Sequence, residues 1–151
     1  MVWSVINFQG TGRLQIVKGT MKQDQYQDIL QKRFVSQLQE WFPNGEKCIF
    51  ILDGAPCHKA KTITKFLAHN NIEVLEWPGN SPDMNPIENI CQFLKKEIAK
   101  NEIKNKVHLI EKLVHEWNHS EELQNKVRNC ISSMPRRIKA LIAAKGHPTK
   151  Y

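Results

Sequence analysis

The sequence predicts an α/β fold in which a mixed β-sheet is flanked by helices and followed by a C-terminal helical segment. Three observations predict it. The chain opens with a hairpin-like pattern, residues 48–52 are apolar without alternation, and the other long stretches place apolar residues at three- and four-residue steps. Alternating strand and helix patterns are typical of such sheets. At 151 residues, of which 40% are hydrophobic, the chain is long enough to bury a core of one domain.

The first forty residues predict a hairpin and a helix. Residues 2–8 are rich in β-branched and aromatic side chains, 9–12 form a turn signal, and 14–17 supply the return strand. The period then changes, and 22–41 predicts an amphipathic helix. Its apolar side chains are Tyr26, Ile29, Leu30, Phe34, Leu38 and Trp41.

The apolar stretch 48–52 predicts a central strand that is covered on both faces. Asp53 follows it directly. Ligands of open parallel sheets bind beyond the carboxyl ends of the strands, so Asp53 is a candidate site residue. The alternative is an Asp that only caps the following turn. A helix over 59–69 and a short strand over 72–75 follow.

The second half of the chain predicts helices. Residues 77–85 hold two prolines, one glycine and two asparagines and therefore predict a loop. Asn85 then fits the N-cap of a helix, Pro86 fits its first position and Glu88 its third. In a capping box the third-position Glu bonds the N-cap backbone N–H, and local pattern alone favours that role for Glu88.

Three more helical stretches follow, and the last is predicted to be interrupted near Pro135. Their apolar markers run from Val107 to Trp117, from Leu123 to Val127 and from Ile131 to Ile142. We expect residues 1–100 to form the α/β part of the domain and 101–151 its helical extension.

The net charge of +7 is concentrated in the helical half. Residues 1–90 carry nine Lys and Arg against nine Asp and Glu, whereas 91–151 carry thirteen against six. A basic helical half suggests a polyanionic partner, although solvated lysine-rich faces explain the charge equally well. No apolar run approaches the roughly 20 residues of a membrane span, and no secretory signal pattern is present, so no membrane partner is expected. The four cysteines form no C-x-x-C pair, which argues against a zinc ribbon or a disulfide scaffold.

Carboxylates at these positions suggest metal chemistry. Mg²⁺ prefers hard oxygen ligands, and two such ions about 3.5–4 Å apart catalyse phosphoryl transfer. Asp53 and Glu88, with 34 residues between them, are each able to serve one metal. Asp83 is either an outer-sphere helper or a turn residue. His58 is a candidate acid or phosphate contact, although a lone His is more often a packing residue, and its neighbour Cys57 does not make it a thiol-protease dyad.

Two segments resemble the catalytic core of transposases of the Tc/mariner superfamily. They are residues 53–60, DGAPCHKA, and residues 77–89, WPGNSPDMNPIEN. The spacing and the final Glu resemble the Tc-like branch of that superfamily. Residues 1–4, residues 134–138 and the tail are also similar, so the resemblance covers essentially the whole chain.

The resemblance implies an RNase H-like fold and divalent-metal-dependent DNA cleavage and strand transfer in transposition and DNA integration. It implies two Mg²⁺ or Mn²⁺ ions held by two Asp and one Glu, of which Asp53 matches the second acid and Glu88 the third. His58, Asn85 and Asp83 are the supporting candidates. DNA, both transposon ends and target, is the implied partner, with a second copy or a full-length transposase, and the implied location is the nucleus. The DNA-binding candidates on the basic helices are Lys95, Lys96, Arg136 and Arg137.

The first acid of the family triad has no counterpart here. In the family it lies on the first sheet strand, before the strand that here begins at Met1. The acids that precede Asp53 all fall in or beside the predicted helix, and they are Asp24, Asp28, Glu40 and Glu46. The family's helix-turn-helix region is also absent, and Gly54 stands where the family commonly has Asn. We therefore expect the C-terminal part of a catalytic domain with impaired activity, from a truncated gene model, a decayed element or a domesticated protein.

Two alternatives belong to other classes. A non-catalytic nucleic-acid-binding or regulatory module would use the basic helices after residue 91, with binding that weakens steeply with salt. A remnant that cannot fold alone would show no cooperative melt.

Overall fold

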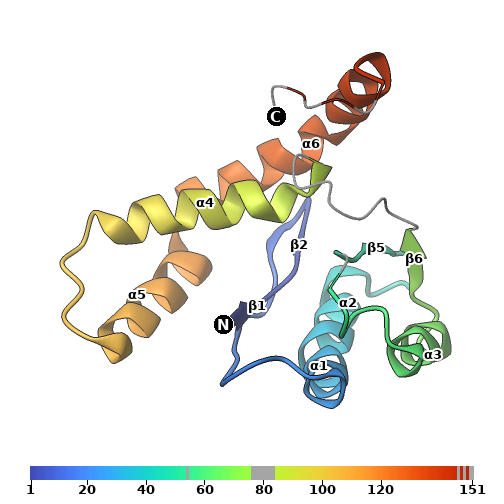
Figure 1. The fold of residues 1–151 in the computed structure, drawn as a ribbon, viewed down its shortest axis with the longest axis horizontal. Coiled ribbons are helices and arrows are strands. Elements are labelled where there is room, and N and C mark those ends of the chain that lie inside the picture. Colours follow the sequence, from blue (N-terminus) through green and yellow to red (C-terminus); the bar gives the residue numbers. More distant parts are fainter. Residues whose placement is uncertain (54, 76–83, 146, 148, 150–151) are drawn as a thin grey trace. The chain divides into compact units, whose positions relative to one another are not determined.

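The computed structural model describes residues 1–53, 55–75, 84–145, 147 and 149. The chain forms two compact units (Figure 1). Unit 1 comprises Met1–Ser4 and Gly12–Asn80, and unit 2 comprises Val5–Thr11 and Ser81–Tyr151. No helix in the part of the chain that the structure describes is long and apolar enough to cross a membrane.

Unit 1 begins with the base of the predicted hairpin. Strand β1 (Val2–Trp3) pairs antiparallel with β4 (Gln15–Ile16). The predicted continuous strand over 2–8 is wrong, because pairing stops at Ser4. The Ser4 hydroxyl donates hydrogen bonds to the carbonyls of Gly12 and Arg13 at 3.2 and 3.1 Å, which satisfies backbone groups where the ladder is broken.

The helix predicted over 22–41 is confirmed. It comprises α1 (Gln23–Ile29), the π-helical η1 (Leu30–Val35) and α2 (Ser36–Trp41). Its inner face is fully buried at three large side chains, Tyr26, Leu30 and Phe34. The ring of Phe34 packs on that of Phe50, with centroids 4.2 Å apart, so this helix supports the strand that precedes Asp53.

Strand β5 (Ile49–Ile51) pairs in parallel with β6 (Glu73–Leu75), with Phe50 opposite Val74. Helix α3 (Lys61–His69) connects them and buries Ile63 and Leu67. The prediction that this strand is covered on both faces is wrong, since Ile49 is 54% exposed. In the described ranges β5 has no second neighbouring strand, and a two-stranded parallel sheet cannot cover both of its faces.

Among its described residues, unit 2 contains the tip of the hairpin and three α-helices. Strands β2 (Ile6–Asn7) and β3 (Gly10–Thr11) pair antiparallel. The turn is therefore made by Phe8 and Gln9, earlier than the predicted 9–12. The Asn7 side-chain oxygen accepts the backbone N–H groups of Gln9 and Gly10 at 2.7 and 3.2 Å, which holds the tight turn.

Helix α4 (Pro86–Ala99) packs against both α5 (Lys106–His119) and α6 (Glu121–Ala143). The apolar faces of these helices form the core of unit 2, as their periodicity predicts. The buried apolar side chains that these helices contribute include Ile90, Leu94, Ile98, Trp117, Leu123, Val127 and Cys130.

Helix α6 runs uninterrupted through Pro135, so the predicted break is wrong. Proline removes one backbone donor, and Pro135 lies on the exposed side, where water can satisfy the freed carbonyl. Side chains reinforce the same turn. The Ser133 hydroxyl donates to the Cys130 carbonyl at 2.6 Å, and Arg137 Nε donates to the Ser133 oxygen at 2.8 Å.

Gln124 of α6 holds the hairpin tip. Its Oε1 accepts the Thr11 backbone N–H at 3.0 Å, and its Nε2 donates to the Thr11 hydroxyl oxygen at 2.8 Å. That hydroxyl donates in turn to the Trp117 carbonyl at 3.0 Å. These bonds fix β3 to the α5–α6 corner.

Candidate functional site

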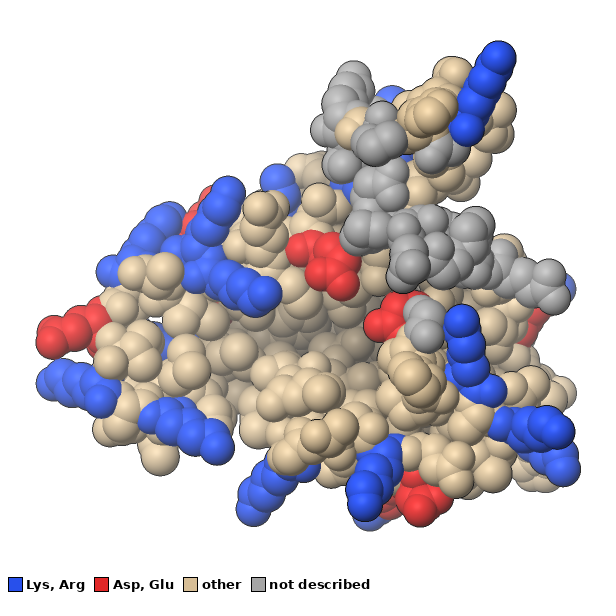
Figure 2. All heavy atoms as spheres, in the orientation of Figure 1, with Lys and Arg blue, Asp and Glu red and all other residues tan. Residues whose placement is uncertain are grey.

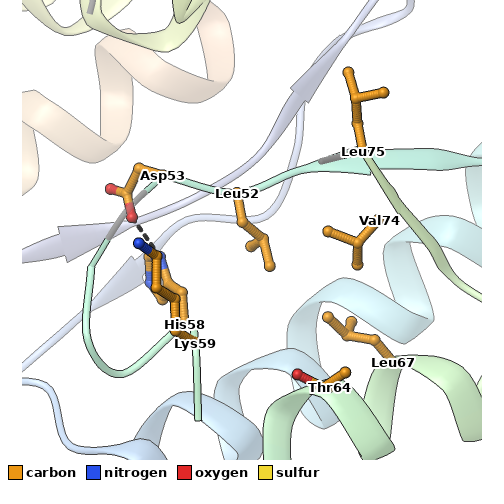
Figure 3. Close-up of a pocket in the computed structure, with 8 residues that line it drawn as sticks. All are labelled: Leu52, Asp53, His58, Lys59, Thr64, Leu67, Val74 and Leu75. Carbon is orange, nitrogen blue, oxygen red and sulfur yellow. Dashed lines mark hydrogen bonds and ion pairs between the residues drawn. The ribbon is translucent and has the colours of Figure 1, made fainter. Parts of the chain in front are cut away.

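Asp53 lies beyond the carboxyl end of β5, as predicted, with Leu52 between it and the last strand residue (Figure 3). Its Oδ1 accepts the backbone N–H of Ala55 at 3.0 Å, and Nδ1 of His58 lies 2.5 Å from the same oxygen. The His58 backbone N–H bonds the Ala55 carbonyl at 2.9 Å, which closes the loop. The turn-capping role of Asp53 is therefore real. It uses one carboxylate oxygen and leaves the side chain 55% exposed.

His58 is held from its other side by Tyr26. The two rings lie with centroids 4.2 Å apart at an angle of 34°. Burial, followed by the charges of Cys57 and Asp53, raises the pKa of Tyr26 well above its ordinary value. The Trp3 indole approaches the phenol and offsets this only in part, but the contact does not reach hydrogen-bond geometry. The buried Tyr26 hydroxyl has no hydrogen-bond partner among the residues that the structure describes. A rigid aromatic stack thus positions the imidazole against the carboxylate.

A hollow of about 290 Å³ adjoins this pair in unit 1. Its walls are apolar, and Asp53, His58 and Lys59 bring a carboxylate, an imidazole and an ammonium group to it (Figure 3). Lys59 was not among the predicted site residues, although it stands within the family-like segment 53–60. The remaining lining residues are Leu52, Thr64, Leu67, Val74 and Leu75.

Asn85 is the N-cap of α4, as predicted, and its side-chain oxygen accepts the Ile87 backbone N–H at 3.3 Å. Pro86 is the first helical residue. Glu88 is exposed in the first turn, where the helix dipole favours a negative charge. No hydrogen bond joins its carboxylate to the Asn85 backbone N–H, so the capping-box alternative is not formed. Burial first, and then the charge of Glu88, raise the pKa of the Cys91 thiol.

The predicted carboxylates belong to different parts of the fold. Asp53 is in unit 1 and Glu88 in unit 2. Asp83 lies outside the described residues. Within the described ranges no three His, Cys, Asp or Glu side chains group closely enough to hold a metal ion.

A second hollow, of about 160 Å³, lies on unit 2 between α4 and α6. It brings together Lys96 and Arg137, two of the predicted DNA-binding residues, and adds Lys126, which sequence reasoning missed. The Asn89 side-chain oxygen is buried without a partner among the described residues. Arg137 is 5% exposed, which is rare for arginine. The other lining residues are Gln92, Phe93 and Cys130.

Lys95 and Arg136 are exposed and do not line this hollow. Figure 2 shows Lys and Arg side chains gathered over the helices that Figure 1 labels α4 and α5. Lys126 carries no local motif, and only the packing of α6 on α4 reveals its position.

Residues 1–110 match the family of DDE superfamily endonucleases. The chain belongs to this DDE family. The match covers the positions of Asp53 and Glu88 and confirms the family resemblance predicted from the sequence.

Relatives of this DDE chain are transposases of nematode elements. It is 32% identical to the transposase of the element Tcb1 of Caenorhabditis briggsae and 28% identical to that of Tc1 of Caenorhabditis elegans, over 153 residues in each case. Both matches cover the whole of this chain but only 54% of the relative. The chain therefore spans about half the length of these curated relatives.

Solved structures of Mos1 transposase share the fold. The Mos1 catalytic domain with raltegravir and Mn matches 99% of this DDE chain and 76% of its own, with a TM-score of 0.86 and 21% identity. A Mos1 paired-end complex with the left transposon end matches with a TM-score of 0.84 and 23% identity. The RNase H-like fold implied by the resemblance is thereby confirmed.

Proposed function

We propose that this chain supplies two of the three carboxylates of a DDE-type transposase site, with Asp53 and Glu88 as ligands of Mg²⁺ or Mn²⁺. The observation that carries the proposal is the position of Asp53 beyond β5, where His58 and Ala55 hold one carboxylate oxygen. The other oxygen is a hard donor on a side chain that is 55% exposed, which fits either ion. Structures of the Mos1 catalytic domain, which has the same fold, have been solved with Mg and with Mn.

The proposed reaction is cleavage and joining of DNA phosphodiesters. When bound, the divalent ions would activate the attacking oxygen and stabilise the leaving one. In this chain, His58 orients the Asp53 carboxylate, and the Lys59 ammonium stands where it can meet a phosphate. Glu88 presents its carboxylate from the start of α4.

We propose further that the chain alone cleaves DNA poorly. The described residues contain no third acid grouped with either carboxylate. An ion displaced by about 1 Å costs on the order of 10²-fold in rate. We also propose that residues 1–100 are the partial catalytic domain and 101–151 its helical extension.

DNA is the proposed partner of the basic helices. The three cations that line the hollow between α4 and α6 suit a backbone phosphate, and the exposed Lys95 and Arg136 would add non-specific contacts. The family suggests three further parts of this proposal. The DNA would be transposon ends and target DNA, the protein partner would be a second copy of the chain or a full-length transposase, and the location would be the nucleus.

Mn²⁺ titration by calorimetry tests the ligands. We expect Asp53→Asn and Glu88→Gln each to weaken Mn²⁺ binding at least about tenfold. Glu102→Gln, an exposed acid elsewhere, is the matched control and should bind as the unchanged chain does. Equal affinities in all four proteins would reject the metal site.

A DNA-nicking assay in Mn²⁺ tests the impairment separately. Robust nicking by the unchanged chain that is lost in Asp53→Asn would disprove poor cleavage while supporting the metal site.

A second candidate function is non-catalytic DNA binding, favoured by the basic hollow on unit 2. Its test is affinity for duplex DNA at rising salt, with Lys96→Ala and Lys126→Ala beside Asp53→Asn. We expect the lysine variants to bind less tightly with a shallower salt slope, and Asp53→Asn to be unchanged. No measurable affinity at low salt would exclude this function.

A further inference from the structure

Two histidines stand one turn apart on α5. Residues 115–119 have the sequence HEWNH, in which His115 and His119 occupy positions i and i+4. Both side chains are exposed, and their ring centroids lie 5.3 Å apart. Residues at this spacing lie on the same helix face. The helix itself therefore brings two imidazoles together, and nothing in the proposed DNA chemistry uses them.

We propose that His115 and His119 form a two-histidine clamp for a borderline divalent metal ion of the Zn²⁺ or Ni²⁺ class. Imidazole nitrogen suits these ions, whereas Mg²⁺ and Mn²⁺ prefer carboxylate and water oxygen. The rings are tilted by 52° and lie on the exposed surface, where rotation about their side-chain bonds can converge one nitrogen from each on a shared ion. Water completes the coordination.

Glu111 extends the same face. It lies one turn before His115 and is exposed. A carboxylate there can accept the second ring N–H of His115, an outer contact that strengthens imidazole as a ligand. The clamp thus consists of two ligands and one supporting acid on a single rigid helix.

The HEWNH sequence has the pattern of zinc peptidases, but this site lacks their further parts. Those enzymes use the Glu as a general base and close the zinc site with a third protein ligand. Among the described residues no three His, Cys, Asp or Glu side chains lie close enough to hold an ion together, so Glu111 does not serve as a third ligand here. The Glu of this motif, Glu116, is half-buried. Its charge acts on Lys100, whose pKa is raised mainly by the hydrogen bond to Glu97 and further by Glu116. The clamp binds an ion without acting as a peptidase.

A bound ion would tie together the last two turns of α5. His119 is the final residue of that helix, and Ser120 caps α6 immediately after it. Because ligand binding to the folded state shifts the unfolding equilibrium, Zn²⁺ should raise the melting temperature of the chain.

Calorimetric titration of the tag-free chain with ZnCl₂ and with NiCl₂ tests the clamp. We expect His115→Ala and His119→Ala each to weaken binding at least about tenfold. Asp53→Asn and His58→Ala should leave this binding unchanged, which separates the clamp from the proposed Mg²⁺ or Mn²⁺ site. His108→Ala controls for histidine number. Affinities that do not fall in His115→Ala or His119→Ala would overturn the proposal.

A matched pair of double variants tests the spacing itself. Glu111→His with His119→Ala places histidines at 111 and 115, again one turn apart, and should restore binding. Glu111→His with His115→Ala has the same composition but places them two turns apart, at 111 and 119, and should not. Circular dichroism on both confirms that α5 remains folded. Equal Zn²⁺ affinity in the two variants would also overturn the clamp.

Discussion

His58 Nδ1 lies 2.5 Å from Oδ1 of Asp53 in the loop that follows β5. The two partners are unequally buried, since the His58 side chain is 14% exposed and that of Asp53 is 55% exposed. Packing therefore holds the imidazole of His58 in place, whereas the carboxylate of Asp53 is held chiefly by its hydrogen bonds. This arrangement orients one carboxylate oxygen and leaves the other toward solvent.

Substitution of His58 should separate its two contacts. His58→Ala removes the ring that stacks on Tyr26 and should lower the free energy of unfolding by about 1 kcal/mol. His58→Phe retains a stacking ring and should recover most of that loss. Both variants remove the bond to Asp53 and should weaken Mn²⁺ binding by about tenfold or more. Chemical denaturation and calorimetry measure the two effects, and full Mn²⁺ affinity in His58→Phe would contradict the orienting role.

Tyr26 should make the chain sensitive to alkali. The raised pKa of its phenol means that the folded chain keeps the proton while the unfolded chain loses it near pH 10. The contribution of the neutral phenol is complete below that pH and is lost above it, at up to about 1.4 kcal/mol per pH unit. Tyr26→Phe should flatten this part of the stability curve and should not lower stability at pH 7, because the hydroxyl has no partner among the described residues. Denaturation between pH 8 and 11 tests this, with Tyr151→Phe as the control for the other tyrosine.

Asn85 should contribute to stability as a helix cap. Asn85→Ala removes the acceptor of the Ile87 backbone N–H and should cost about 1 kcal/mol in urea denaturation. Asn85→Ser keeps a capping oxygen and should cost much less. If the two substitutions are equally destabilising, capping is not the main role of this side chain.

Gly10 should tolerate no side chain. Its φ is +140°, and a Cβ placed there would clash with Oε1 of Gln124. We expect Gly10→Ala to destabilise the chain by about 1–3 kcal/mol through strain and loss of the Thr11 hydrogen bonds. Adding Gln124→Ala should remove the clash but not the backbone strain, so the double variant should lose less than the sum of the singles. Strict additivity in thermal denaturation would contradict the contact.

Local sequence patterns predicted the helices. They did not predict features that depend on which other elements pack beside a segment. The Asn85 cap and the helix from 23 to 41 follow from residues close in sequence, and both are found. The strand over 49–51 was expected to be buried because its side chains are apolar. Its exposure depends on which strands stand beside it, which no local pattern contains. Pro135 predicted a break because the rule for proline is local, whereas Ser133 and Arg137 support that turn from the same helix.

The candidate site likewise contains residues that the sequence alone predicts and residues that only the fold brings together. Asp53 was predictable from its place after a strand, and the family resemblance identified Glu88 against its local capping pattern. The ring contact between Tyr26 and His58 joins residues that are 32 positions apart in the sequence, so it can be seen only in the folded structure. Lys126 joins Lys96 for the same reason, because α6 packs on α4.

The hairpin is shared between the two units, its base with unit 1 and its tip with unit 2. The chain consequently passes from one unit to the other three times, after Ser4, Thr11 and Asn80. A gene split after Asn80 would yield a first fragment that carries β2 and β3, whose packing partner α6 lies in the second fragment. If the two halves were co-expressed, the packing of β2 and β3 on α6 would bring them together again. For the same reason, a single protease cut after Asn80 would leave the two fragments associated.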